Sequence, residues 1–238
     1  MLNKLDSLGP KIRPWLLFTA LNTVNRKLDS DSKTLLDVGC GTGKPIKFIN
    51  RHGKYFAVAL GTFAPYLKQC KKEKLHNTYV QGDVRHLPFS DKAFDVVLCL
   101  EVLEHLEREE GKKLLRELER VGCRQVILST PVGNSKQSSY EGNPHQEHKY
   151  IWSPREMKTL GYKVIGVGMR NLSCKSGIQS VFPRPVRWLV DIVWVLAGPF
   201  VYYCPTLAGD MGCIKFCQND LSPCWIEKKP IERKSESA

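Results

Sequence analysis

Three glycines at alternate positions, Gly39, Gly41 and Gly43, are the residues of this sequence best suited to binding a nucleotide-like cofactor. They follow directly on residues 35–38, an apolar run with one acid that is typical of a buried strand. Glycine lets the backbone adopt positive φ and approach a ligand with no Cβ in the way. The dinucleotide fingerprint G-x-G-x-x-G would place its third glycine at position 44, where Lys44 stands. The spacing therefore predicts a cofactor loop of another kind, or else a tight strand-to-helix turn with no ligand.

A series of strands and helices must position this loop. Apolar and β-branched runs predict strands at residues 34–38, 55–60, 78–81, 94–100, 124–130, 163–167 and 210–217. Helical periodicity predicts helices at 14–28 and 109–121, and Ser153, Pro154 and Glu156 together signal the start of another. Alternating strands and helices imply a doubly wound α/β fold whose ligand crevice lies at the carboxyl ends of its parallel strands.

The glycine loop and the segments that follow it resemble the class I S-adenosylmethionine (SAM) dependent methyltransferases, in particular their type 11 or small-molecule-like subgroup. The segments are D-V-G-C-G-T-G at 37–43, Y-V-Q-G-D-V at 79–84, L-P-F at 87–89 and F-D-V-V-L-C-L-E-V-L-E-H-L at 94–106. A later segment, E-G-N-P-H-Q-E-H at 141–148, resembles a loop of uncharacterised methyltransferases. The resemblance implies a Rossmann-like, mostly parallel, seven-stranded sheet whose last strand is antiparallel and inserts between the two before it.

The resemblance also implies that SAM is the cofactor. Asp83 would accept a hydrogen bond from the adenine amine, and the backbone N–H of Val84 would reach a ring nitrogen. Leu100 and Glu101 would lie beside the methionine moiety. The implied cofactor-binding residues are Asp37, Gly39, Cys40, Gly41, Gly43, Gly61, Thr62, Asp83, Val84, Leu100 and Glu101.

One feature of the family is missing at the end of the second predicted strand. Class I methyltransferases usually have an Asp or Glu there that binds both ribose hydroxyls of SAM, whereas this sequence has no acid from Val38 to Lys72. Aligning Pro65-Tyr66-Leu67 with the family places Gly61 at the position of the acid, with Ala59 as the other choice. The resulting loss of a charged acceptor predicts weak SAM binding, binding rescued by Thr62, or none.

Histidine is the candidate for acid–base work. Methyl transfer from a sulfonium is an in-line displacement, so the protein positions the nucleophile and removes a proton where needed. A neutral imidazole with a pKa near about 6.5 suits that task. His105 and His148 are the candidate catalytic residues, with His145 less favoured and structural hydrogen bonding or packing as the alternative. His145 and His148 could also ligate a metal, but no predicted helix fixes their spacing, so no metal is expected.

The chain of 238 residues has 36 Lys and Arg against 24 Asp and Glu, a net charge of +12. Eight of the basic residues lie between Lys44 and Lys74 with a single acid, a surface that would suit RNA, anionic lipid or an acidic substrate, or would simply be solvated. Nine cysteines without C-x-x-C pairs favour reduced thiols. Since residues 1–10 also lack an apolar signal region, we expect a cytoplasmic protein.

Residues 186–208 are strongly apolar, but Asp191 and Pro199 interrupt them, and a membrane crossing would separate the last strand from its sheet. We expect either a lid over the site or an apolar surface that rests on a membrane or partner. The predicted organisation is a single domain over 1–226, followed by a disordered tail at 227–238. Within the domain we expect a helical extension (1–33), a cofactor-binding core (34–169), an apolar helical insertion (170–209) and the last strand (210–217).

The sequence thus predicts a SAM-dependent methyltransferase for a small-molecule or lipid-like acceptor. Nucleic acid is an improbable but open acceptor. Enzymes that methylate amino groups carry a D/N-P-P-Y segment after the fourth strand, and this segment is absent here. Cytosine C5 methyltransferases need a catalytic Pro-Cys at the same strand end, whereas Pro223-Cys224 lies near the tail. The alternatives are a catalytically silent binding or regulatory protein of the same fold, or an RNA-directed methyltransferase.

Overall fold

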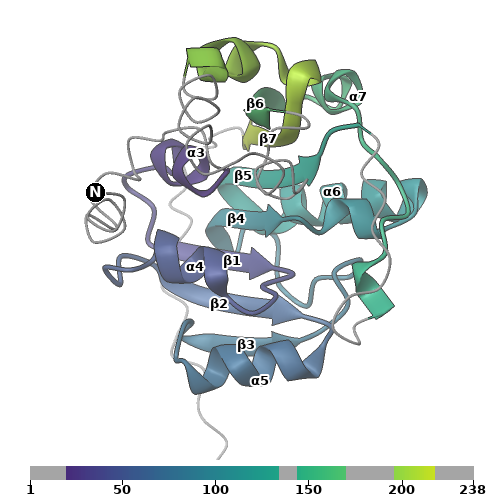
Figure 1. The fold of residues 1–238 in the computed structure, drawn as a ribbon. Helices are drawn as coiled ribbons and strands as arrows, with labels where there is room; N and C mark the ends of the chain where they lie inside the picture. Colours follow the sequence, from purple (N-terminus) through teal and green to yellow (C-terminus); the bar gives the residue numbers. More distant parts are fainter. Residues whose placement is uncertain (1–19, 134–143, 170–195, 218–238) are drawn as a thin grey trace, which may run out of the picture.

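A seven-stranded sheet forms the centre of the molecule (Figure 1), with the strand order β3-β2-β1-β4-β5-β7-β6. The computed structural model describes residues 20–133, 144–169 and 196–217. The strands are β1 (Thr34–Val38), β2 (Phe56–Gly61), β3 (Thr78–Gln81), β4 (Phe94–Leu100), β5 (Gly122–Pro131), β6 (Lys163–Met169) and β7 (Ala208–Phe216). Strands β1 to β5 pair in parallel, and β7 runs antiparallel between β5 and β6. The predicted α/β class and strand arrangement are therefore confirmed.

Helices cover both faces of the sheet. They are α3 (Ala20–Lys27), α4 (Lys44–Ile49), α5 (Ala64–Lys72), α6 (Arg108–Val121) and α7 (Pro154–Thr159), with 3-10 turns η2 (Leu103–His105), η3 (Pro144–Gln146) and η5 (Pro205–Leu207). Alternate residues of β1 serve the two cores: Leu36 packs in a cluster with Leu114 of α6, whereas Leu35 packs in another with Ile46 of α4. A strand that is apolar on both sides requires this double cover.

Most predicted boundaries lie within two residues of the observed ones, and the differences have local causes. Strand β7 begins at Ala208, before the predicted 210, because Met169 and Ala208 extend its pairing with β6. The predicted helix start at Ser153 is confirmed, since its side chain accepts a hydrogen bond from the Glu156 N–H and Pro154 is the first residue of α7. The described part of the predicted 14–28 helix is α3.

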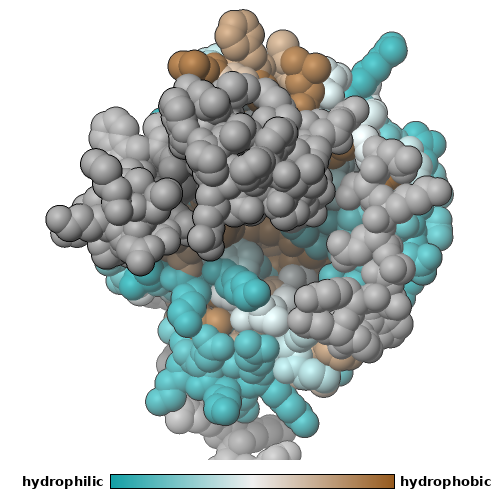
Figure 2. Space-filling model, in the orientation of Figure 1, coloured by the Kyte–Doolittle hydropathy of each residue, from teal (hydrophilic) through white to brown (hydrophobic). Residues whose placement is uncertain are grey.

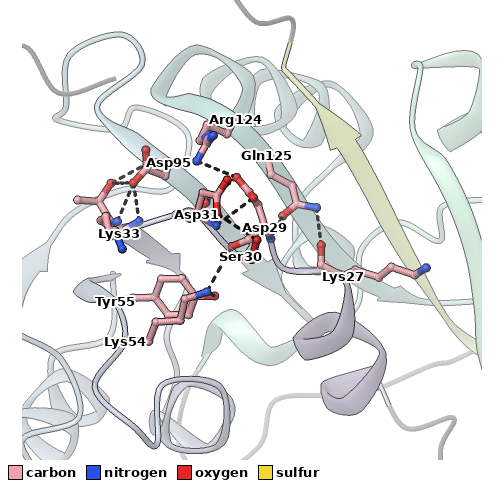
Figure 3. A network of polar contacts seen from close by, with 12 residues as sticks. Lys27, Asp29, Ser30, Asp31, Lys33, Lys54, Tyr55, Asp95, Arg124 and Gln125 are labelled. Atoms are coloured by element: carbon pink, nitrogen blue, oxygen red, sulfur yellow. Dashed lines mark hydrogen bonds and ion pairs between the residues drawn. The ribbon is translucent and has the colours of Figure 1, made fainter. Parts of the chain in front are cut away.

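A polar network connects residues at the amino-terminal ends of the central strands (Figure 3). Ligands bind at the opposite, carboxyl ends of the strands in such folds. One carboxylate oxygen of Asp95 accepts hydrogen bonds from the Lys33 N–H at 2.8 Å and the Thr34 N–H at 2.9 Å. The buried Gln125 amide receives the Asp29 N–H at 3.1 Å and donates to the Lys27 carbonyl at 2.8 Å. These bonds join the end of α3 and the start of β1 to β4 and β5, and so fix the strand that carries the glycine loop.

The predicted apolar insertion falls largely on residues 170–195, which lie outside the described residues, as do 1–19, 134–143 and 218–238. The proposed domain limits therefore stay predictions. Residues 196–203 are helical, and Figure 2 shows apolar side chains gathered there, at the top of the molecule, with hydrophilic ones over α5 at the bottom. Across the described ranges, no helix is long and apolar enough to cross a membrane.

Cysteine chemistry differs from the expectation at one position. Six cysteines in the described part of the chain are free thiols, namely Cys40, Cys70, Cys99, Cys204, Cys213 and Cys217. Cys123, near the start of β5, is disulfide-bonded, so the prediction that every thiol is reduced is wrong there.

Candidate functional site

A cleft of about 270 Å³ opens at the carboxyl ends of β1 to β4. This is where parallel α/β sheets bind ligands, because the loops that follow neighbouring strands meet there. The cleft is lined by Gly39, Cys40, Gly41, Gly61, Thr62, Phe63, Tyr66, Leu67, Asp83, Val84, Arg85, Glu101, Val102, His105, Leu106, Glu110, His145, Gln146 and Lys149. Nine of the thirteen residues predicted for cofactor binding or catalysis are among them.

The glycine loop after β1 is shaped by left-handed backbone at Gly39 (φ 71°), Gly41 (φ 52°) and Gly43 (φ 75°). A Cβ on Gly39 would lie 2.3 Å from a methyl carbon of Val102, so only glycine fits between the loop and the turn after β4. The Gly39 N–H donates to the Leu60 carbonyl at 2.8 Å, and the Cys70 thiol donates to the Gly41 carbonyl at 3.3 Å. The loop is thus held against β2 and α5, open toward the cleft.

Two predicted cofactor residues support the loop from outside the cleft lining. Asp37 is buried in β1, where its carboxylate pairs with His76 Nε2 at 2.9 Å. Gly43 faces away, since a Cβ there would meet Leu75 at 2.4 Å and the Cys70 sulfur at 2.9 Å. Both residues therefore fix the loop's shape in this structure instead of lining the space for a ligand.

The end of β2 carries no acid. Gly61 is the last residue of β2, is buried and lines the cleft, which is the position where the family acid was expected. Its φ lies outside the left-handed range, and a Cβ would lie 3.6 Å from both the Cys40 sulfur and Leu67 Cγ, which is ordinary contact. The adjacent Thr62 hydroxyl donates to the Gly82 carbonyl at 3.1 Å and couples the ends of β2 and β3.

The end of β3 presents a carboxylate held by an arginine. Asp83 accepts two hydrogen bonds from the Arg85 side chain onto one oxygen, at 3.0 and 2.6 Å, and Arg85 also pairs with Glu110 of α6. The hydrogen bonds from Arg85 hold the pKa of Asp83 below its usual value and raise the pKa of the guanidinium. Asp83 is thus an ionised acceptor, and its side chain is 40% exposed at the cleft. Arg85 and Glu110 were not predicted.

The turn after β4 is strained at the cleft. Glu101 is one of three residues other than glycine with positive φ in the described part of the chain, at 57°. Its N–H donates to the Ser129 carbonyl at 3.0 Å, and the Ser129 hydroxyl donates to its carboxylate at 2.8 Å. Strain of this kind costs about 1 to 3 kcal/mol and is common at functional sites. Leu100, the residue before it, lies outside the cleft lining.

Two predicted histidines are brought together from distant segments. His105 ends η2, His148 follows η3, and their ring centroids are 5.1 Å apart. Burial lowers the pKa of His105, and His148 lowers it further, while the carbonyl of Glu147 opposes the shift. His105 lines the cleft, whereas His148 lies outside the cleft lining. Glu104, which the sequence analysis did not single out, lies with both: one ligand atom from each of the three lies within 4.8 Å of the others.

Parts of this chain are similar in sequence and in fold to known methyltransferases. Residues 36–128 match the type 11 family model described as a methyltransferase domain. An uncharacterized protein of Methanocaldococcus jannaschii is 29% identical over 154 residues, covering 63% of this chain and 64% of that one. Norajmaline N-methyltransferase of Rauvolfia serpentina is 32% identical over 126 residues, covering 48% and 42%. A tRNA U34 carboxymethyltransferase of Nautilia profundicola is 29% identical over 128 residues, covering 50% and 42%.

Among solved structures, a chain of the complex between the Haloferax volcanii Trm112 methyltransferase activator and a methyltransferase has a TM-score of 0.58. It is 15% identical, and the match covers 88% of this chain and 92% of that one, so it shows the shared fold. The chain spans less than two thirds of the first curated relative and under half of the other two.

Proposed function

We propose that this chain, which carries the class I SAM-dependent methyltransferase domain, transfers the methyl group of SAM to a small-molecule or lipid-like acceptor. SAM is the cofactor of this family, and when bound it supplies an activated methyl group on a sulfonium centre. The observation that carries the proposal is the cleft itself, where segments from four separate strands meet.

The residues of the cleft fit the cofactor. Gly39 and Gly41 line the cleft without side chains and so leave room for a ligand beside their backbone. Asp83 offers an ionised hydrogen-bond acceptor for an amine. The Val84 backbone and the strained turn at Glu101 complete the walls that the family uses for adenine and methionine groups. Catalysis then depends on positioning and on proton removal, for which neutral His105 is at hand beside the cleft.

The acceptor class is inferred from surface chemistry. Leu196, Phe200 and Tyr203 are 69, 73 and 78% exposed on the helix of residues 196–203. Exposed apolar side chains of this size are suited to contact an apolar acceptor or a lipid surface. This supports a small or lipid-like acceptor, together with a cytoplasmic protein that contacts membranes through this helix. Because the relatives include a norajmaline N-methyltransferase and a tRNA U34 carboxymethyltransferase, a tRNA acceptor is the alternative outcome of an acceptor screen.

A catalytically silent binding protein is the second candidate. The specific observation that favours it is Gly61, because the ribose of SAM would lack its usual charged acceptor at the end of β2. In addition, Arg85 donates two hydrogen bonds to the carboxylate of Asp83, which leaves this carboxylate less able to accept a hydrogen bond from adenine.

Calorimetry with SAM and with S-adenosylhomocysteine separates the two candidates. The methyltransferase proposal predicts saturable binding of both ligands at micromolar to millimolar concentration, and Asp83→Asn should weaken both. Lys112→Gln is a matched surface control, since Lys112 pairs with the exposed Glu109 and lies outside the cleft lining. Failure of both ligands to bind at millimolar concentration would exclude the enzyme and leave the silent protein.

A further inference from the structure

Glu104, His105 and His148 form a mixed carboxylate and imidazole cluster, of which His105 lines the cleft. Glu104 and His105 belong to η2, directly after β4, and His148 belongs to the segment after η3. One ligand atom from each residue lies within 4.8 Å of the other two. The cluster spans 44 positions of sequence, so the fold and not local spacing brings it together.

Backbone hydrogen bonds hold the two segments together. The N–H groups of Lys149 and Tyr150 both donate to the Glu104 carbonyl, at 2.8 and 3.2 Å. His105 Nδ1 lies 3.0 Å from the Glu147 carbonyl oxygen. These contacts flank His148 on both sides and place its ring beside that of His105. The three side chains are therefore presented by fixed backbone, as metal ligands in proteins generally are.

The donor chemistry suits a cation. The Glu104 side chain is buried, with 1% of the residue exposed, and a carboxylate at such a position is stabilised by positive charge. A carbonyl oxygen can only accept, so His105 Nδ1 must carry the proton of this hydrogen bond, and Nε2 keeps its lone pair. Metal-binding histidines characteristically donate their other ring N–H to a carbonyl or carboxylate in this way.

We propose that Glu104, His105 and His148 bind one divalent cation of the class that prefers mixed nitrogen and oxygen ligands, such as Zn²⁺, Mn²⁺ or Co²⁺. Two histidines and one carboxylate are a common ligand set for catalytic zinc and for non-haem iron, and three protein ligands leave positions open for water or substrate. With metal–ligand bonds of about 2.0 to 2.2 Å the ligand atoms would stand closer than the 4.8 Å limit, so modest side-chain rotation accompanies binding.

The location gives the cation a role that rests on the proposed function. Because His105 lines the cleft, an ion held by it could bind an oxygen or nitrogen of the acceptor at an open position and orient it. The nearby carboxylate of Glu101, whose charge also acts on His105, adds to the negative potential. The histidines would then serve as ligands instead of as the general bases that the sequence analysis predicted.

Binding is tested on the full chain after chelator treatment and dialysis, with the metal alone. Titration with Co²⁺, followed by visible absorption and calorimetry, should show one site per chain. His148→Ala and His105→Ala should each weaken binding at least about tenfold. His145→Ala is the matched control, because His145 lies in the same loop but outside the cluster, and its variant should bind Co²⁺ as the unmodified chain does. Glu104→Gln keeps the shape of the buried side chain and removes its charge, and should also weaken binding.

The inference is overturned if Co²⁺, Zn²⁺ and Mn²⁺ show no saturable binding at millimolar concentration, or if His145→Ala weakens binding as much as His148→Ala. Circular dichroism of each variant confirms that a loss of binding is not a loss of folding. Titration of the metal-free chain with S-adenosylhomocysteine separates this inference from the function. Cofactor binding without metal binding overturns the metal site alone, whereas metal binding without cofactor binding overturns the proposed methyltransferase.

Discussion

A carboxylate introduced at Gly61 should make the cleft bind SAM and S-adenosylhomocysteine more tightly. Gly61 ends β2, lines the cleft and is buried. An added Cβ would lie 3.6 Å from the Cys40 sulfur and 3.6 Å from Leu67 Cγ, and no left-handed φ opposes a side chain. The backbone therefore accepts a Cβ at this position, and Gly61→Asp supplies the acid with which class I methyltransferases usually bind the ribose hydroxyls.

The size of the effect follows from the type of bond restored. Hydrogen bonds to a charged acceptor contribute about 1.5 to 3 kcal/mol, which corresponds to roughly 10- to 150-fold in affinity. Gly61→Asn provides a neutral acceptor of similar shape and should gain only about 1 kcal/mol, or roughly fivefold. Gly61→Ala adds the Cβ alone and should change affinity less than about twofold. Calorimetry with S-adenosylhomocysteine measures all four proteins.

A second signature comes from stability. Without ligand, the new carboxylate replaces hydrogen at a buried position beside the Cys40 thiol and should lower the melting temperature of Gly61→Asp. With ligand, the rise in melting temperature should exceed that of the unmodified chain, because tighter binding stabilises the folded state more. If Gly61→Asp folds but binds no more tightly than Gly61→Ala, the ribose does not lie at the end of β2 and the alignment of residues 65–67 is refuted.

Three further predictions concern the framework of the site. Gly39→Ala should lower the free energy of unfolding by about 2 to 4 kcal/mol, because the added Cβ clashes with Val102 and the backbone is left-handed. Gly53→Ala is the control: its backbone is also left-handed, but its Cβ meets nothing within 4 Å, so it should cost only about 1 kcal/mol. Equal costs in urea denaturation would contradict the steric argument. His76→Ala should cost about 3 kcal/mol or more, because the buried carboxylate of Asp37 loses its partner at 2.9 Å, and a cost near zero would be the contrary result. Burial lowers the folded-state pKa of His105, so between that pKa and the unfolded value of about 6.5 the unfolded chain binds more protons and stability rises with pH. His105→Gln should make the stability of the protein less dependent on pH from 5 to 7, and an unchanged slope would exclude this contribution.

Local patterns explain what could be predicted from the sequence. The strand at 34–38 is an apolar run followed by glycines, and the start of α7 is a capping signal within four residues, so both depend on neighbours in the chain. The antiparallel insertion of β7 came from the resemblance to a family, because no local pattern specifies which strands pair. The cleft at the strand ends then followed from the topology alone.

The partners of the site residues could not be predicted, because packing between distant elements determines them. Arg85 stands two residues after Asp83, which hints at the pair, but its bond to Glu110 depends on how α6 crosses the end of β3. Glu104 is similar: nothing in its local sequence indicates that the loop after β5 places His148 beside it. The sequence therefore predicted individual site residues, whereas their partners depend on the packing of elements that are distant in the chain.

Two groups of buried carboxylate and imidazole side chains in the described part of the chain differ in their position relative to the cleft. Asp37 and His76 are in direct contact at 2.9 Å within the core and lie outside the cleft lining. Glu104 lies instead with two imidazoles, their ligand atoms spread within 4.8 Å, and one of these rings lines the cleft. The Glu104 side chain is buried beside these rings, where a nearby positive charge would offset part of the free-energy cost of burying a carboxylate. A cation that binds the folded chain stabilises it, so a metal-dependent rise in the melting temperature of the unmodified chain that is lost in His148→Ala would support the proposed cation site beside the cleft.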